Sequence, residues 1–301
     1  MNDKNNIVVS ICSITYNQVH YIRQCLDGFL MQKTNFKFEI IIHDDCSTDG
    51  TTDIVREYAE KYPNIVPIIQ TVNQYQNGNK RILASFVYPK VRGKYIALCE
   101  GDDYWIDPLK LQKQVDFLES HPDYSMCFHR ATILNEIENQ ENDLMCHDIE
   151  DREYDPNELF AKWKVPTASI VAKRDILDIE NKGTDRILNG DIIQVLNCAK
   201  FGKIRGMSDC MSIYRLQSTG VTYNKGLKKD RIMRYPAHFE FIKENYPFLN
   251  KNIVNRKIAG AYLVKRKTES NKFAYLRDVW LSFFYYPIGL FRLLLGLKYT
   301  K

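Results

Sequence analysis

Strand-like and helix-like segments alternate four times in the first 120 residues of this chain. Apolar, β-branched runs predict buried strands at 7–15, 38–43, 65–71 and 95–99. Helices are predicted at 20–32, from apolar residues at helical spacing, at 51–61, after capping residues, at 81–90, and at 108–120, which opens at a proline. This alternation with short connections is typical of a mostly parallel sheet that carries helices on its faces. We therefore expect an α/β fold.

Polar side chains gather where three of these predicted strands end. The three clusters are Tyr16-Asn17, Asp44-Asp45 and Glu100-Gly101-Asp102-Asp103. In open α/β sheets, ligands bind beyond the carboxyl ends of the strands. The clusters are therefore expected to lie close together and to form the functional site.

The third cluster places three carboxylates within four residues. Glu100, Asp102 and Asp103 repel one another unless a positive charge compensates them. Mg²⁺ and Mn²⁺ do this with oxygen ligands, and they commonly bridge a pair of carboxylates to substrate phosphates. Gly101 would let the backbone approach such a ligand closely. The alternative is a solvated acidic turn without a metal.

The second cluster has two interpretations. A carboxylate at Asp45 can accept hydrogen bonds from a base or a ribose. It can instead cap the helix predicted at 51–61, as Ser47, Thr48 and Asp49 also can. Both roles are compatible, because Asp44 and Asp45 are adjacent and can divide them.

Three motifs occur in the order and at the spacing of one enzyme family. They are Val8-Val9-Ser10-Ile11 leading to Thr15-Tyr16-Asn17, then Ile40-Ile41-Ile42-His43-Asp44-Asp45-Cys46-Ser47-Thr48-Asp49-Gly50, then Gly93-Lys94-Tyr95-Ile96-Ala97 leading to Glu100-Gly101-Asp102-Asp103-Tyr104-Trp105. On these motifs the chain resembles the inverting family-2 glycosyltransferases, closely over residues 1–110 and more loosely to 220. The resemblance implies a Rossmann-like glycosyltransferase A fold and a nucleoside-diphosphate sugar donor, usually a uridine one.

The resemblance also implies roles for single residues of the donor site. Thr15, Tyr16, Asn17 and Asp45 would line the nucleoside pocket, and Asp44 would belong to the same donor-binding set.

The metal, Mn²⁺ or Mg²⁺, would be held mainly by Asp102. Glu100 stands where the family generally has the first aspartate of its DxD motif, so it is a second candidate ligand with a side chain one methylene longer. Asp103 would lie at the sugar or support the turn.

By the same resemblance, an acidic residue heading a later helix would be the catalytic base. The best match is Asp191 in Asn189-Gly190-Asp191-Ile192-Ile193, and Asp185 is the second candidate. The alternative for Asp191 is an ordinary helix N-cap. As base, it would take the proton of an acceptor hydroxyl while that oxygen displaces the diphosphate in line, with inversion.

Arg215 matches a position where the family often has a basic residue that holds the diphosphate or the acceptor. The family often has a histidine just beyond it, where this chain has Gln217. The acceptor pocket is expected from 165–169, within a strand predicted at 165–171, and from 135–152, a polar, acidic segment predicted as a mobile loop. A saccharide or lipid-linked saccharide of a cell-surface polysaccharide pathway would be the acceptor.

The last part of the chain differs in charge from the rest. Residues 225–301 hold 17 Lys and Arg against 5 Asp and Glu, whereas the remainder is acidic. We therefore predict a catalytic domain at 1–222 and a basic, helical extension at 223–301. Within it, 279–297 is apolar and aromatic but is interrupted by proline, glycine and arginine, which favours an in-plane anchor on an anionic membrane over a span. The alternative is a helical cap that packs on the catalytic domain or, in a homodimer, on a second copy.

Composition and missing motifs bear on location and on rival functions. A polar N-terminus and scattered cysteines without metal spacing predict a cytoplasmic protein, peripheral on the inner face of the cell membrane. Missing motifs count against rival functions. The chain has no GxGxxG motif after a strand, so a dinucleotide-dependent oxidoreductase is disfavoured. A sugar nucleotidyltransferase would carry a glycine-rich basic loop after its first strand, which 13–17 is not. Nucleic-acid binding fits poorly, because the basic residues lie beside apolar aromatic runs. A non-catalytic nucleotide-sugar-binding scaffold of the same fold remains the alternative.

Overall fold

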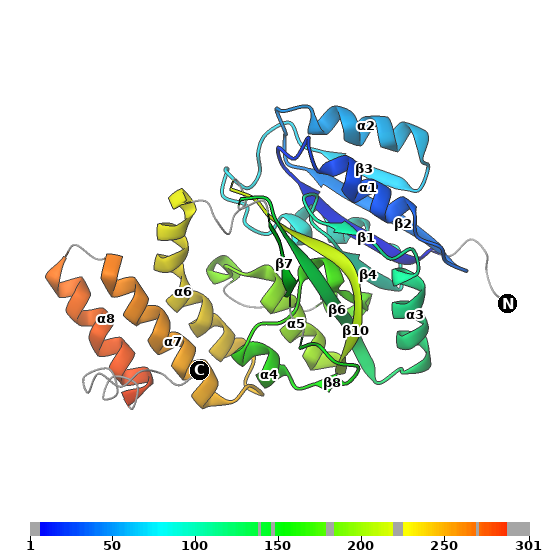
Figure 1. Cartoon of the computed structure of the whole chain (residues 1–301). Helices are drawn as coiled ribbons and strands as arrows, with labels where there is room; N and C mark the ends of the chain where they lie inside the picture. Colours follow the sequence, from blue (N-terminus) through cyan, green and yellow to red (C-terminus); the bar gives the residue numbers. More distant parts are fainter. Residues whose placement is uncertain are drawn as a thin grey trace. The chain divides into compact units, whose positions relative to one another are not determined.

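The computed structural model describes residues 7–137, 140–145, 148–178, 184–218, 225–268 and 271–287 (Figure 1). Contacts divide the chain into two units. The first is Met1–Ile179 with Gln194–Gln217, and the second is Glu180–Ile193 with Ser218–Lys301. The described part of the first unit is an α/β domain, and that of the second is mainly helical.

The first unit is built on one mixed sheet with strand order β3-β2-β1-β4-β9-β6-β10-β5. Its strands are β1 Ile7–Thr15, β2 Lys37–Asp44, β3 Ile65–Ile69, β4 Tyr95–Leu98, β5 Tyr104–Trp105, β6 Tyr124–Asn135, β7 Gln140–Met145, β8 Glu153–Tyr154, β9 Val171–Lys173 and β10 Lys203–Leu216. The first four strands in sequence are parallel, as predicted. β9 runs antiparallel between β4 and β6, and β6 pairs in parallel with β10.

Helices cover both faces of this sheet, because side chains of a strand alternate between its faces. Val9 and Ile11 of β1 pack with α1 Ile22–Leu30, α2 Thr51–Lys61 and α3 Lys110–Ser120. Cys12 of the same strand faces the other core, which contains residues of the π-helical turn η1 Leu83–Val87, of α4 Pro156–Ala161 and of α5 Gly190–Phe201. The α/β expectation is confirmed.

Two predicted segments differ from their expected form. The helix predicted at 81–90 is the π turn η1 followed by a 3₁₀ turn, η2 Tyr88–Lys90. Pro89 has no N–H and so cannot continue an α-helical ladder. The strand predicted at 165–171 is mostly the 3₁₀ turn η3 Thr167–Ser169, closed by the Ser169 hydroxyl donating to the Pro166 carbonyl at 2.6 Å.

The loop predicted at 135–152 is wrong in part, because β7 lies within it and pairs antiparallel with β6. β6 was not predicted, and for β10 the sequence predicts only short strands at 203–204 and 211–214. β10 has register shifts between Met207 and Ser212, which explains why only its two halves resemble strands in the sequence.

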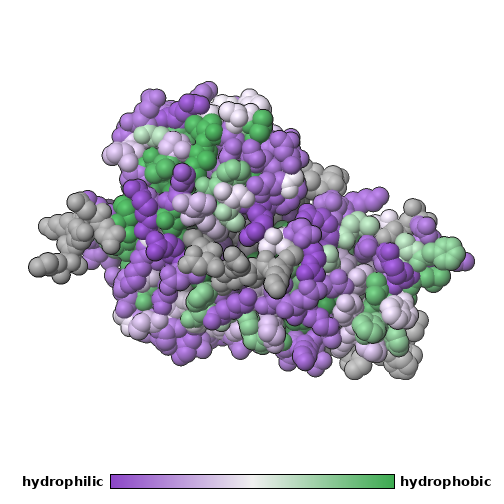
Figure 2. All heavy atoms as spheres, turned by 180° about the vertical axis from the view of Figure 1, so that it is seen from behind, coloured by the Kyte–Doolittle hydropathy of each residue, from purple (hydrophilic) through white to green (hydrophobic). Residues whose placement is uncertain are grey.

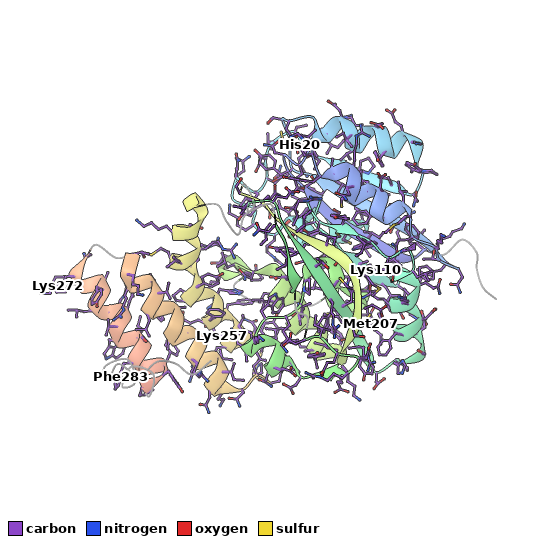
Figure 3. The ribbon with its side chains drawn as sticks, viewed as in Figure 1. His20, Lys110, Met207, Lys257, Lys272 and Phe283 are labelled. Carbon is purple, nitrogen blue, oxygen red and sulfur yellow. The ribbon has the colours of Figure 1, made fainter. Side chains whose placement is uncertain are left out.

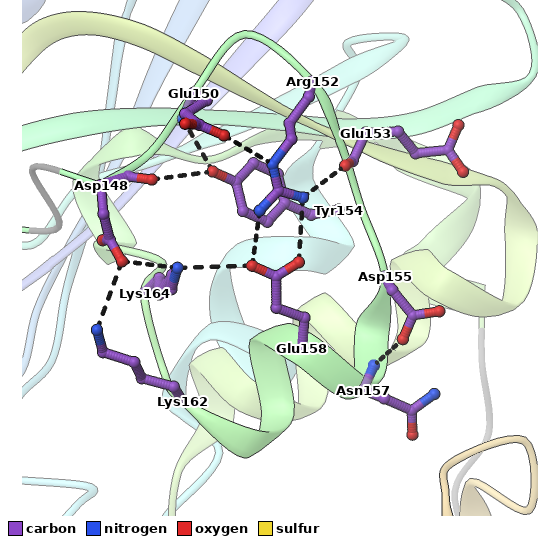
Figure 4. A network of polar contacts seen from close by, with 10 residues as sticks. All are labelled: Asp148, Glu150, Arg152, Glu153, Tyr154, Asp155, Asn157, Glu158, Lys162 and Lys164. Carbon is purple, nitrogen blue, oxygen red and sulfur yellow. Dashed lines mark hydrogen bonds and ion pairs between the residues drawn. The ribbon is translucent and has the colours of Figure 1, made fainter. Parts of the chain in front are cut away.

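A polar network holds the segment that follows β7 (Figure 4). The Arg152 guanidinium donates to Glu158 through two nitrogens and lies 3.7 Å from the centre of the Tyr154 ring. Lys164 pairs with Asp148 at 2.7 Å. These bonds fix α4 against β8. None of them involves the turns at the carboxyl ends of the parallel strands.

Lys110 is a fully buried cation in the core of the first unit (Figure 3). Its amine donates to Gln114 Oε1 at 2.8 Å and lies 4.0 Å from the centre of the Trp105 ring. Burial lowers the pKa of Lys110 from 10.5 to about 7, since water no longer solvates the ammonium.

We expect Lys110 to make the stability of the protein depend on pH. Between about pH 7 and 10.5 the unfolded chain binds a proton at this amine that the folded chain does not, so the free energy of unfolding rises with pH in this window. Lys110→Met should flatten that rise in urea denaturation measured at several pH values. Lys113→Met, at an exposed neighbour whose pKa is raised instead, should leave it in place. An unchanged slope in Lys110→Met would contradict the assignment.

The second unit contains three described helices. They are α6 Lys225–Asn245, α7 Lys251–Lys265 and α8 Lys272–Tyr285. Phe241, Ile242, Val254 and Ile258 form part of its buried interior. The helical extension predicted from the sequence is confirmed, but 288–297 of the predicted anchor lies outside the described residues. Within the described residues, none of the helices combines the length and the apolar character that crossing a bilayer requires.

Candidate active site

The polar clusters meet at the point where the strand order reverses. The chain proceeds outward from β1 to β2 and β3, then returns to β4 on the other side of β1. Such a reversal opens a crevice beyond the carboxyl ends of the two central strands. Thr15 at the end of β1 lies at this point, because its carbonyl accepts the Asp45 N–H at 3.0 Å and Gly101 N–H bonds to the adjacent Ile14 carbonyl at 3.0 Å.

The turn after β1 is tied to the turn after β2 by reciprocal hydrogen bonds. Asn17 has a positive φ of 51°, which asparagine tolerates better than most residues. Its N–H donates to Ser47 Oγ at 2.9 Å, and its side-chain oxygen accepts the Thr48 N–H at 2.9 Å. Tyr16 is exposed beside this turn. Asn17 therefore holds the turns after β1 and β2 together, with the Tyr16 ring exposed beside them.

Asp44 and Asp45 have separate partners. Asp44 is fully buried, and its carboxylate accepts from the Ser47 and Thr52 hydroxyls. Asp45 accepts the N–H groups of Gln74 and Tyr75 at 2.8 and 3.0 Å. Asp44 thus holds the turn, whereas Asp45 anchors the loop after β3. The alternative that Asp45 caps the next helix is wrong, because Asp49 accepts the Thr51 N–H at 3.0 Å near the start of α2.

The acidic turn after β4 packs directly on the end of β1. A Cβ on Gly101 would come within 2.5 Å of Gln18 Oε1 and 2.9 Å of the Thr15 side chain, so only glycine fits this approach. Asp102 is half-buried, and its Oδ2 accepts from the Gln217 amide at 2.6 Å. Burial raises the pKa of Asp102, while Gln217 and Arg215 oppose the rise.

Asp103 points away from the crevice and supports the turn. Its Oδ1 accepts the Arg215 N–H at 2.8 Å, and its buried Oδ2 has no hydrogen-bond partner in the described part of the chain. Burial, and then the charges of Asp102 and Glu100, raise the pKa of Asp103 well above its usual range. Of the two roles predicted for Asp103, the geometry favours support of the turn.

Arg215 is a buried organiser of the site. Its guanidinium donates to the Asp102 carbonyl at 2.8 Å, to Gln24 at 2.7 Å and to Glu136. The same group lies 4.6 Å from the ring centre of Tyr21. Since its donors are directed at the protein, we interpret Arg215 as a residue that positions the acidic turn.

The residues of this turn fit a divalent cation. Asp102 and Glu100 supply hard oxygen ligands, and after burial their charges are the next causes that raise the pKa of Asp103, so negative charge gathers at this turn where a cation would offset it. Among the described residues, no group of three or more His, Cys, Asp or Glu side chains converges as a metal site. That is expected for a Mg²⁺ or Mn²⁺ ion that one or two carboxylates share with substrate phosphates.

Asp191 lies in the first turn of α5, as predicted, and belongs to the second unit. Burial raises its pKa, and the nearby Arg231 opposes the rise. Three residues further along the same helix, Gln194 accepts the Tyr88 hydroxyl at 3.1 Å. Asp185 lies in the 3₁₀ turn η5 Thr184–Arg186 and is exposed. The role of Asp191 as base stays a prediction.

Sequence reasoning missed the amides that arrange the carboxylates. Gln18, Gln24 and Gln217 contact Thr15, Arg215 and Asp102, respectively, and no motif distinguishes them from other glutamines. Only Gln217 carried a signal, since it replaces a histidine that is common in the resembling family.

Comparison with known proteins decides the family. A model of the family described as glycosyl transferase family 2 matches residues 10–218, which include every strand of the parallel core except the start of β1. The chain belongs to glycosyltransferase family 2. In this family-2 chain, the matched region contains all the predicted donor and metal residues.

Two relatives are similar to this glycosyltransferase-family chain over most of its length. An uncharacterized protein of Mycobacterium tuberculosis (strain ATCC 25618 / H37Rv) is 37% identical over 222 residues, which are 72% of this chain and 61% of that protein. The chain thus spans about three fifths of the length of that relative. TuaG of Bacillus subtilis (strain 168), a glycosyltransferase proposed for teichuronic acid biosynthesis, is 27% identical over 83% of this chain and 98% of its own length.

Solved structures share the glycosyltransferase A fold. Residues 1–349 of S. aureus TarS in complex with UDP-GlcNAc match with a TM-score of 0.59 at 16% identity, over 98% of this chain and 93% of that one. The mannosyltransferase PcManGT from Pyrobaculum calidifontis, in complex with GDP-Man and Mn²⁺, matches with a TM-score of 0.53 at 16% identity, over 95% and 83%. At these identities the likeness confirms the fold alone.

Proposed function

We propose that this protein transfers a sugar from a uridine-diphosphate donor to a hydroxyl of a saccharide or lipid-linked saccharide, with inversion and with the help of Mn²⁺ or Mg²⁺. The observation that carries the proposal is the convergence of three turns on Thr15 at the reversal of strand order. One turn supplies Tyr16 and Asn17, one supplies Asp45, and one supplies Glu100 and Asp102.

The donor would lie across this crevice. Tyr16 would stack on the base, and Asn17 and Asp45 would shape the pocket for base and ribose. Asp45 also fixes the loop 73–75, so a nucleoside in this pocket would meet an already ordered loop. Fold neighbours crystallised with UDP-GlcNAc and with GDP-Man support a nucleoside-diphosphate sugar as donor.

Asp102, with Glu100 as second candidate, would hold the metal. The ion would neutralise the charge that builds on the leaving diphosphate. Arg215 and Gln217 would hold the Asp102 turn in place from behind. Asp191 would accept the proton of the acceptor hydroxyl, and burial raises its pKa, which makes the carboxylate a stronger base.

Cell-surface polysaccharide synthesis is the proposed setting, supported by the relationship to TuaG. The second candidate is a scaffold that binds the nucleotide sugar without turnover. The organised acidic turn favours the enzyme, because a pure binding protein needs no metal at the diphosphate.

Titration calorimetry tests the proposal. UDP should bind to the protein when Mn²⁺ is present, and its affinity should fall at least about tenfold when the metal is chelated, a loss of about 1.4 kcal/mol. Slow Mn²⁺-dependent hydrolysis of a UDP-sugar would then separate the enzyme from the scaffold. Absence of binding by any nucleoside diphosphate in the presence of Mn²⁺ would contradict both.

A further inference from the structure

Helix α8 has its apolar and polar faces reversed relative to an ordinary surface helix. Its fully buried side chains are Asp278 and Ser282, one helical turn apart. Several large apolar side chains of the helix are exposed: Phe273 is 83% exposed, Leu276 52%, Trp280 60% and Phe284 63%. In water, a helix normally buries its apolar stripe and exposes its polar one.

The exposed residues form one continuous stripe. Positions 273, 276, 280 and 284 recur at intervals of three and four residues, so they lie along one side of the helix. Phe283, labelled in Figure 3, is a fifth exposed apolar side chain and neighbours Phe284 in the helix. Trp280 and Phe284 stack with their ring centres 5.5 Å apart. Over the C-terminal helices, Figure 2 shows hydrophobic groups at the surface among hydrophilic ones.

The inner face of α8 makes polar contacts with α6 and α7. Asp278 pairs with Arg277 at 2.9 Å and with Lys265 of α7 at 3.8 Å. The Tyr285 hydroxyl donates to Glu240 of α6 at 3.0 Å. These bonds fix the rotation of the helix, so the aromatic stripe is held outward by the structure of the unit itself.

The charge around the stripe indicates what covers it. Residues 251–268 and 271–287 contain one acidic side chain, Asp278, and it is fully buried. The same segments contain eight basic residues: Lys251, Arg256, Lys257, Lys265, Arg266, Lys267, Lys272 and Arg277. A second copy of this surface would be repelled by its like charge, whereas anionic lipid headgroups would be attracted.

We propose that the α8 stripe inserts into the headgroup region of an anionic bilayer, with the helix lying in the plane of the membrane. Aromatic and leucine side chains enter the boundary between headgroups and acyl chains, and the basic residues of α7 and α8 contact the lipid phosphates. This inference places the insertion at 273–284, upstream of most of the segment predicted from the sequence. It does not depend on the proposed transferase activity.

Vesicle sedimentation with the full 301-residue chain tests the proposal. The protein should sediment with phosphatidylcholine vesicles that contain phosphatidylglycerol, less with phosphatidylcholine alone, and less when salt is raised. The triple variant Phe273→Ser, Trp280→Ser, Phe284→Ser should lose at least about tenfold in partition coefficient, because three inserted side chains are removed. The control Phe201→Ser, at an exposed phenylalanine on α5, should bind like the unaltered chain.

Tryptophan fluorescence provides a readout that does not require loss of binding. Trp280 is one of three tryptophans, and Trp105 is buried in the first unit. Anionic vesicles should shift the emission of the unaltered chain to the blue, and Trp280→Phe should remove the shift while it keeps the binding. Equal binding by the triple variant, or binding without the shift, would overturn the proposal. If the protein dimerises and the triple variant does not, the stripe is covered by a second copy of the chain. If the protein binds vesicles only after residues 288–301 are removed, the stripe is covered by that segment.

Discussion

Asp102→Asn should reduce sugar transfer by about 10²–10³-fold, because a ligand of the metal at the leaving diphosphate loses its charge. The Gln217 amide can still bond to the remaining carbonyl oxygen, so the turn should keep its shape. The UDP affinity measured with Mn²⁺ should fall to the value measured without it. Initial rates with a UDP-sugar and calorimetry with UDP are the measurements.

Asp116→Asn is the matched control for this change. Asp116 is exposed on α3 and bonds to Gln112 at 2.7 Å, outside the crevice. Its variant should keep the rate and the metal dependence of the unaltered protein. Should Asp102→Asn retain near-normal turnover and still respond to Mn²⁺, then Asp102 is not the metal ligand.

Asp191→Asn should lower the turnover number by about 10²–10⁴-fold, the contribution typical of a general base. UDP binding should stay unchanged, since the amide removes only the proton acceptor. In the unaltered enzyme, turnover should rise with pH through a pKa above the ordinary aspartate range, because burial raises the pKa of Asp191 and only the ionised form accepts a proton.

Asp185→Asn distinguishes the two candidates for the base. Asp185 is exposed six residues earlier in the chain, and no neighbouring group marks it for catalysis. Its variant should transfer sugar within about twofold of the normal rate, as expected for a surface substitution away from the site. The reverse pattern, with Asp185→Asn inactive and Asp191→Asn active, would move the base to Asp185.

The parallel core of the fold was predictable because its signals are local. β1, β2 and β4 are apolar runs buried on both faces, and each ends in a polar turn. The antiparallel part was less predictable. β7 begins with four polar residues, 140–143, so its sequence does not resemble a buried strand, and it pairs with β6 in the fold.

The candidate site was also predictable only in part. The carboxylates at 44–45 and 100–103 were identified because three motifs mark them. The division of labour among them was not, since it depends on contacts across the sequence. Asp103 and Arg215 lie 112 positions apart, yet the backbone of one binds the carboxylate of the other. Nothing in the sequence near Asp103 predicts that bond.

Trp105 connects the acidic turn after β4 to the 3₁₀ turn η3. Its indole N–H donates to the Ala168 carbonyl at 2.9 Å, so the acidic turn is joined to the 3₁₀ turn predicted to face the acceptor. A relative that acquires a different acceptor by remodelling 165–169 must keep this carbonyl in place or lose alignment of the metal ligands. On the predicted acceptor role of 165–169, acceptor preference would therefore change mainly through the side chains of that turn, while its backbone path stays fixed.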